Sequence, residues 1–358
     1  MKYLTGWEIE FYKDKHNYLQ LIEETMQQKQ ECDVGFLEES LCDLTGRTYA
    51  IPCASGTDAL EVSLRALGIG PGDEVLVPSF SWISSASVVK LVGAKPVFIE
   101  VALSNYHMIP AHMMACITEN TKAAICPHLF GSMFDPRVVQ ELCDTAGIHF
   151  IEDACQAIGA SYDDIPAGAS GTTSCFSFNT NKNIAGFSGG GAMLTDDPDI
   201  AAYARKWSRH GEGEFLGRNS KMLLLDAKVI DYRLKHIWEW QLRRQTMADV
   251  YNTKLEPYPV ILQNTDENVD HSYHKYVVMF ENQEIRDAVK AKIGGTVHYQ
   301  KPLYEYEIFK DEKPKQNFPL AKNICDTILS VPFHHFYDPE DVAVQANEIV
   351  EVLDRYYG

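Results

Sequence analysis

One lysine stands out by its surroundings. Lys182 follows an apolar, strand-like run at 174–178 and precedes three glycines at 189–191, and the residues between these segments are otherwise uncharged. A lysine held among uncharged groups can lose its proton near neutral pH, and the free amine can then attack a carbonyl carbon. Most lysines are solvated surface charges, so this interpretation depends on what else the chain places beside Lys182.

A candidate phosphate-binding turn lies earlier in the chain. The segment Ser55-Gly-Thr-Asp-Ala-Leu60 opens directly into a predicted helix. Free backbone N–H groups at a helix start bind phosphate, and here Thr57 adds a hydroxyl while Gly56 permits a close approach. An ordinary helix cap is the alternative for this hexapeptide taken alone. It contains neither a Walker loop nor the Gly-x-Gly-x-x-Gly pattern of dinucleotide-binding proteins.

Two further candidate groups follow predicted strands. Trp82 lies just past the apolar run at 74–77, where its indole can stack on a planar ligand, with core packing as the alternative. Asp153 ends the apolar run at 149–152, and a buried carboxylate needs a positive partner. Capping of the next helix is the alternative for Asp153. Gln156, one turn later, is placed to hydrogen-bond a ring substituent.

These segments together match the needs of one cofactor. Ser177, in the run at 174–178, adds a second hydroxyl close to Lys182. In chain order the sequence offers phosphate donors, an aromatic ring, a strand-tip acid and a reactive amine, each beside a strand terminus. Pyridoxal phosphate requires such a set, because a carboxylate that keeps its pyridine nitrogen protonated strengthens the ring as an electron sink. The sequence therefore predicts a pyridoxal phosphate site around Lys182.

The elements that must position these groups alternate along the first two-thirds of the chain. Short apolar strands are predicted at 74–77, 96–101, 123–126, 149–152, 175–178 and 192–195. Helices are predicted between them, notably at 60–67 and 137–146. Apolar strands of this kind are typically covered on both faces. The alternation predicts an α/β fold with a mostly parallel sheet sandwiched by helices.

The pattern changes after about residue 198. Helices are predicted at 200–208 and 234–251, then short strands near 275–280 and 296–299, and a closing helix at 339–356. This change predicts two domains, a large cofactor-binding domain at 1–245 and a smaller C-terminal α+β domain at 246–358.

Composition limits the classes of partner. A net charge of −18 argues against a nucleic-acid partner, because binding to phosphate backbones depends on clustered Lys and Arg. No apolar stretch reaches the roughly 18–20 residues of a membrane-spanning helix, and the first residues lack the apolar core of a secretion signal. No membrane association is expected, and the cytoplasm is the expected location. No His, Cys and carboxylate cluster has metal-ligand spacing, so no metal is expected.

The chain resembles the sugar aminotransferases of the DegT/DnrJ/EryC1/StrS family over nearly its whole length. The resemblance implies a fold-type I pyridoxal phosphate enzyme with a seven-stranded sheet and a homodimer with shared active sites. It also implies L-glutamate as the amino donor and a keto sugar linked to a nucleoside diphosphate as the acceptor. It rests on Ala-Ser-Gly-Thr-Asp-Ala-Leu (54–60), Gly-Pro-Gly-Asp-Glu-Val-Leu-Val-Pro-Ser-Phe-Ser-Trp (70–82), Pro-His-Leu-Phe-Gly (127–131), Ile-Glu-Asp-Ala-Cys-Gln-Ala (151–157), Gly-Arg-Asn-Ser-Lys-Met (217–222), Val-His-Tyr-Gln-Lys-Pro-Leu (297–303) and Leu-Ser-Val-Pro-Phe-His (329–334).

The resemblance also implies individual roles. Lys182 would hold the cofactor covalently and shuttle protons, and Asp153 would pair with the pyridine nitrogen. Trp82 would stack on the ring, and Gln156 would lie on the side of the ring hydroxyl. The remaining implied contacts are, for the phosphate, Gly56, Thr57, Ser177 and, from the neighbouring subunit, Asn219, and, for the substrate, Asn179, His298 and Tyr299.

Some positions depart from the family pattern. Lys221 stands where the family often has Arg, and Asn179-Thr-Asn181 replaces the frequent His-Pro or Tyr-Pro. The amino-acid sequence at 55–60 and the spacing from Lys182 to Ala192 are more similar to those of the family branch that acts on 3-keto sugars than to those of the branch that acts on 4-keto sugars. We therefore predict transfer to a 3-keto-6-deoxyhexose carried by dTDP, in the biosynthesis of O-antigen or another surface glycan. The alternatives are a 4-keto-sugar aminotransferase, a dehydratase of the same family, and a cofactor-bound regulatory protein without turnover.

Overall fold

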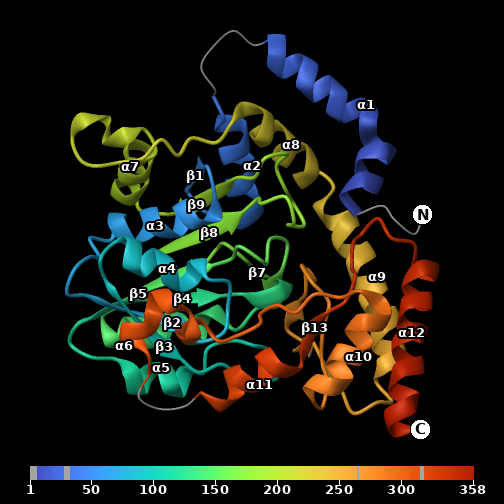
Figure 1. Cartoon of the computed structure of the whole chain (residues 1–358). Helices are drawn as coiled ribbons and strands as arrows, with labels where there is room; N and C mark the ends of the chain where they lie inside the picture. Colours follow the sequence, from blue (N-terminus) through green and yellow to red (C-terminus); the bar gives the residue numbers. More distant parts are fainter. Residues whose placement is uncertain (1–5, 28–32, 264–265, 315–317) are drawn as a thin grey trace.

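A seven-stranded sheet forms the centre of the computed structural model, which describes residues 6–27, 33–263, 266–314 and 318–358 (Figure 1). The strand order is β3-β2-β4-β5-β8-β9-β1, and β9 runs antiparallel to both of its neighbours while the others run parallel. The mostly parallel sheet predicted from the sequence is confirmed. The strands are β1 (Tyr49–Cys53), β2 (Glu74–Pro78), β3 (Lys95–Ile99), β4 (Thr121–Pro127), β5 (His149–Asp153), β8 (Thr173–Ser177) and β9 (Gly191–Thr195).

Helices cover both faces of this sheet because successive strand residues point to opposite sides. Val75 and Val77 of β2 pack into the core beneath α3, α4 and α7, whereas Leu76 packs into the core beneath α5 and α6. The first face carries α3 (Gly56–Ala66), α4 (Ser84–Leu91) and α7 (Pro198–Trp207); the second carries α2 (Gly35–Thr45), α5 (Pro110–Cys116), α6 (Pro136–Ala146), α8 (Leu224–Leu234) and the start of α9 (Ile237–Leu255).

A second, antiparallel sheet lies in the C-terminal part of the chain. Its order is β10-β12-β13, and it shares a separate apolar core with α9, α10 and α12, which lie together beside β13 in Figure 1. The domain boundary between residues 245 and 246 stays a prediction, and it would fall within α9. The elements of this part are β10 (Ile261–Leu262), β12 (Val277–Met279), α10 (Gln283–Ile293), α11 (Pro319–Thr327), β13 (Ile328–Ser330) and α12 (Pro339–Tyr357).

One prediction for this part of the chain is confirmed with a shifted start, and another is wrong. The helix predicted at 234–251 is α9, which begins at Ile237 after α8 ends at Leu234. The strand predicted at 296–299 is a single bridge between Thr296 and Ser330. The chain leaves the sheet after that one residue pair, and Tyr299 instead lines a cavity beside the seven-stranded sheet.

The remaining elements lie at the periphery. The N-terminal helix α1 (Gly6–Gln27) is tied to α8 by a buried ion pair between Glu10 and Arg233. A small sheet of order β11-β6-β7 contains β6 (Ser161–Tyr162), β7 (Ile165–Pro166) and β11 (Val269–Asp270). Within the described residues, no helix is both long and apolar enough to cross a membrane.

Candidate active site

A cavity of about 430 Å³ lies at the carboxyl ends of β5 and β8, beside the first turn of α3. Parallel sheets commonly bind ligands at this edge, because the loops that follow neighbouring strands converge there. All but one of the site residues predicted from the sequence line this cavity. They are Gly56, Thr57, Trp82, Asp153, Gln156, Ser177, Asn179, Lys182, His298 and Tyr299.

The first turn of α3 forms one end of the cavity. Ser55 caps the helix by accepting a hydrogen bond from the N–H of Asp58 at 3.1 Å, which leaves the N–H groups of Gly56 and Thr57 without intrahelical acceptors. The Thr57 hydroxyl lies 2.8 Å from that of Ser84. Free N–H groups, hydroxyls and the positive end of a helix suit a phosphate group.

Gly56 is required here by the close approach of β8 to the helix. A Cβ added at Gly56 would lie 2.7 Å from the Cβ of Ser177 and 3.0 Å from the sulfur of Cys155. The helix start and the end of β8 can therefore approach closely only when residue 56 has no side chain.

We expect the Gly56→Ala variant to bind pyridoxal phosphate about tenfold more weakly, because overpacking of this kind costs about 1–3 kcal/mol. Titration of the apoprotein with the cofactor, followed by absorbance, measures the effect. Gly70→Ala is the matched control, since a Cβ at Gly70 would meet only an ordinary contact at 3.6 Å. Equal affinities for both variants would show that the approach at Gly56 does not shape the phosphate site.

Asp153 ends β5 as a buried carboxylate with neutral partners. It accepts hydrogen bonds from the Ser85 hydroxyl at 2.9 Å and from the N–H of Cys155 at 3.2 Å. The ion pairs found among the described residues do not include one with Asp153. A buried anion whose hydrogen-bond donors are all neutral is costly, so a cationic ligand group suits this position. The protonated pyridine nitrogen of pyridoxal phosphate is such a group.

Lys182 lies in the loop between β8 and β9, and its N–H donates to the Asn179 carbonyl at 2.9 Å. Burial lowers the pKa of the Lys182 ammonium, while the charges of Cys155 and Asp153 oppose the shift. A lowered pKa increases the fraction of free amine, which is the nucleophilic form. The environment predicted for Lys182 from its uncharged sequence neighbours therefore agrees with the structure.

Aromatic rings enclose another side of the cavity. Trp82 is 56% exposed, so its indole does not belong to the core, and its ring centroid lies 6.0 Å from that of Tyr299. Gln156 accepts from the N–H of Phe130 at 3.2 Å and donates to the Tyr299 hydroxyl at 3.1 Å. Gln156 thus ties the C-terminal segment that contains Tyr299 to the large sheet.

Several other lining residues were not among the site residues predicted from the sequence, and they include Ser85, His274 and Lys275. Ser85 lies in the first turn of α4, and the other two lie just before β12. For Lys275 the available signal is a lysine at the start of an apolar strand run, 275–280. No comparable signal in the sequence connects Ser85 to Asp153, since 68 residues separate them.

Asn219 is the predicted site residue that does not line the cavity within one chain. It is exposed, in a segment whose backbone forms a bridge to Arg209. Its role from a neighbouring subunit stays a prediction.

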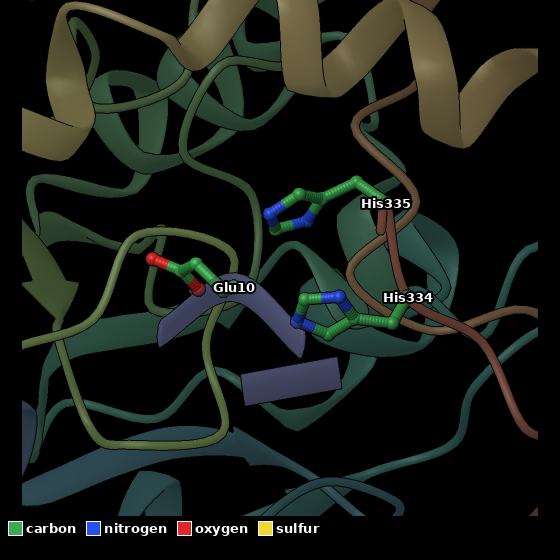
Figure 2. A group of neighbouring side chains, drawn as sticks. All are labelled: Glu10, His334 and His335. Atoms are coloured by element: carbon green, nitrogen blue, oxygen red, sulfur yellow. The ribbon is translucent and has the colours of Figure 1, made fainter. Parts of the chain in front are cut away.

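A group of potential metal ligands lies away from this cavity. Figure 2 shows Glu10, His334 and His335 pointing toward one another, and their ligand atoms lie within 4.8 Å of each other. Glu10 already accepts from Arg233 at 2.7 Å, and Arg244 lies 3.1 Å from the Nδ1 atom of His335. Two guanidinium charges beside the three ligands oppose a cation at this position.

We therefore expect neither EDTA nor zinc to change the melting temperature of the protein, in keeping with the sequence-based expectation of no metal. Scanning calorimetry with and without one equivalent of Zn²⁺ measures this. A rise in the melting temperature on adding zinc that disappears in His335→Ala would contradict the expectation and identify Glu10, His334 and His335 as a metal site.

Comparisons with known proteins agree with this geometry. Residues 13–350 match the model of the DegT/DnrJ/EryC1/StrS aminotransferase family. A UDP-2-acetamido-2-deoxy-3-oxo-D-glucuronate aminotransferase from Pseudomonas aeruginosa is 33% identical over 319 residues, which are 87% of this chain and 88% of that protein. A dTDP-3-amino-3,4,6-trideoxy-alpha-D-glucose transaminase from Streptomyces venezuelae is 35% identical over 306 residues, covering 83% and 81% of the two chains.

Solved structures are similar over nearly the whole chain. A DegT DnrJ EryC1 StrS aminotransferase from Brucella abortus has a TM-score of 0.91 at 28% identity, and the match covers 99% of each chain. NtdA from Bacillus subtilis, solved with bound cofactor PMP, has a TM-score of 0.85 at 25% identity, covering 96% of this chain and 82% of that one. These similarities confirm the fold-type I architecture predicted from the sequence.

Proposed function

Because the chain belongs to the DegT/DnrJ/EryC1/StrS aminotransferase family and is a pyridoxal phosphate-dependent nucleotide-sugar aminotransferase, we propose that it transfers the amino group of L-glutamate to the keto group at position 3 of a dTDP-linked 6-deoxyhexose. The names of the two relatives above support position 3, one with a 3-oxo and the other with a 3-amino group. The sugar in the first name is linked to UDP, and the sugar in the second name is linked to dTDP. A 4-keto sugar is the alternative acceptor.

The observation that carries this proposal is the convergence of four different groups on one cavity. The start of α3, Asp153, Trp82 and Lys182 all line it. We assign the phosphate to Gly56, Thr57 and Ser177, and the pyridine nitrogen to Asp153. The indole of Trp82 covers the ring, and Gln156 lies on the side of the ring hydroxyl.

Bound pyridoxal phosphate supplies an aldehyde that accepts the amino group and a ring that delocalises charge from the adjacent carbon. The chain supplies the groups that move protons and hold the reactants. Lys182 would remove a proton from the donor carbon that bears the transferred nitrogen. In the second half of the reaction it would return a proton to the sugar carbon that receives this nitrogen. Its lowered pKa favours this general-base role near neutral pH. A histidine at this position would instead favour the dehydratase alternative.

Some polar groups that line the cavity are suited to a hydroxylated sugar. Asn179, His298 and Tyr299 line the cavity beside Lys182. The His298 ring is neutral near pH 7, since burial and the charges of Lys275 and Lys182 lower its pKa to about 4. Its Nδ1 atom lies 2.8 Å from the Ser330 hydroxyl, which leaves Nε2 for a substrate hydroxyl.

The active form in this proposal is a homodimer in which Asn219 contacts the phosphate of the neighbouring subunit. Support comes from the exposed apolar side chains on either side of Asn219, with Leu216 93% and Leu223 62% exposed. Apolar side chains this exposed commonly lie in subunit interfaces. We further propose a cytoplasmic enzyme that serves O-antigen or another surface glycan.

Incubation of the holoenzyme with L-glutamate and a panel of dTDP-linked 3-keto- and 4-keto-6-deoxyhexoses tests the proposed reaction. Stoichiometric 2-oxoglutarate together with a 3-amino sugar is the expected result. A 4-amino product would select the alternative acceptor. Loss of water from the sugar without 2-oxoglutarate would select the dehydratase.

A further inference from the structure

Lys275 lies in the same cavity as Lys182, although it comes from the segment that leads into β12. Its N–H donates to the Phe130 carbonyl at 3.3 Å. Arg244 donates to the carbonyl of Tyr273, two residues earlier, at 2.8 Å. These contacts hold the backbone of Lys275 beside the cavity, which its side chain lines.

The charges around the cavity are unbalanced. Among the described residues that line it, Asp153 is the only acidic side chain, and it faces two lysines and no arginine. No acidic side chain in the described chain acts on the pKa of Lys275, which burial and the charges of Lys182 and Arg244 lower to about 8. His274 adds no charge, because burial holds its pKa well below the usual value.

Under the proposed function, the other two charged groups already have partners. Asp153 pairs with the cofactor nitrogen, and Lys182 acts at the carbon that exchanges nitrogen. The cofactor phosphate has its own donors at the start of α3. The ammonium of Lys275 is therefore left without a counter-charge in a half-enclosed cavity, and a buried unpaired charge is unfavourable.

We propose that Lys275 binds a carboxylate of the substrate. This inference rests on the proposed function and extends it to a residue that sets substrate charge. Lys182 and Lys275 line the same cavity. Lys182 must reach the reacting carbon, so we place the partner of Lys275 close to that carbon. A carboxylate satisfies this condition, whereas the diphosphate of a nucleotide sugar is separated from its keto carbon by the sugar ring.

Under the proposed function the dicarboxylic amino donor presents such a carboxylate. An acidic sugar would present one as well, in place of the proposed 6-deoxyhexose. The experiment compares three inert probes on the holoenzyme by titration calorimetry. Glutarate reproduces the donor without its amino group. UDP-glucuronate and UDP-glucose differ only in the sugar carboxylate. Each probe is measured on the wild type, on Lys275→Met, which removes the charge but keeps the chain length, and on Lys275→Arg, which keeps the charge.

The proposal predicts at least about a tenfold rise in Kd for a carboxylate probe in Lys275→Met, with recovery in Lys275→Arg. A rise for glutarate identifies the amino donor, and the KM for L-glutamate should then rise more than kcat falls. A rise for UDP-glucuronate with UDP-glucose unchanged identifies an acidic sugar. The matched control is Lys290→Met, which removes an exposed lysine of α10 and should leave all three Kd values unchanged.

Unchanged Kd values for both carboxylate probes in Lys275→Met would overturn the proposal, as would equal weakening of UDP-glucuronate and UDP-glucose without an effect on glutarate. Circular dichroism melting of each variant identifies any loss of folding.

Failure of the proposed function would give a different result from failure of this inference. In that case the wild type would form no 2-oxoglutarate from L-glutamate, while glutarate binding could still depend on Lys275.

Discussion

Lys182→Ala is expected to lower the rate of 2-oxoglutarate formation from L-glutamate by at least about 10³-fold. In the proposed mechanism the variant loses both the amine that holds the cofactor covalently and the base that moves the proton, and general-base removal alone costs about 10²–10⁴-fold. The side chain makes no hydrogen bond on which the fold depends among the contacts of the described residues. The variant should therefore fold and melt like the wild type.

Covalent labelling distinguishes Lys182 from its neighbour Lys275 in the same cavity. Reduction with sodium borohydride in the presence of pyridoxal phosphate should leave the pyridoxyl group on the peptide that contains Lys182, as read by mass spectrometry. Lys182→Ala should lose this label, and the surface control Lys290→Ala should keep it. A label on Lys275 in the wild type would reverse the assignment of the two lysines.

The central sheet was predictable because its strands are buried on both faces. Runs such as 75–77 and 123–126 are wholly apolar, which local sequence reveals without knowledge of the partners. β1 was missed because Pro52 interrupts its run, and a proline is tolerated there since β1 is an edge strand with β9 as its only neighbour in the sheet. A strand was predicted where the structure has a single bridge at Thr296, because β-branched and aromatic residues favour strands wherever they occur.

The core of the site was predictable for a topological reason. Asp153 and Ser177 end neighbouring parallel strands, and Gly56 begins the helix packed against them, so the fold itself brings these groups together. Ser85 and Lys275 reach the cavity from α4 and from the segment before β12. Their positions depend on long-range packing that local patterns do not encode. The role proposed for Asn219 requires a second subunit, whose position the structure of one chain does not give.

Asp153→Asn is expected to reduce kcat/KM for L-glutamate by about 10²-fold or more while leaving the melting temperature of the apoprotein nearly unchanged. Asparagine keeps the shape of the side chain. Its amide oxygen can accept from the N–H of Cys155, and its NH2 group can donate to the hydroxyl oxygen of Ser85. What it loses is the negative charge that we propose keeps the pyridine nitrogen of the cofactor protonated. The effect should therefore appear in catalysis and in the absorbance spectrum of the bound cofactor, and not in folding.

Glu152→Gln is the matched control, because Glu152 precedes Asp153 on β5 and points to the opposite face of the sheet. Its carboxylate accepts from the N–H groups of Gly168 at 2.9 Å and Ser170 at 2.8 Å, and it pairs with His128 at 3.0 Å. Loss of its charge should lower the free energy of unfolding by about 1–3 kcal/mol and leave kcat/KM of the folded fraction close to that of the wild type. The reverse pattern, with Asp153→Asn unstable and Glu152→Gln inactive, would show that Glu152 serves the cofactor and Asp153 the fold. The two substitutions on adjacent residues of one strand thus test separately which carboxylate serves catalysis and which stabilises the fold.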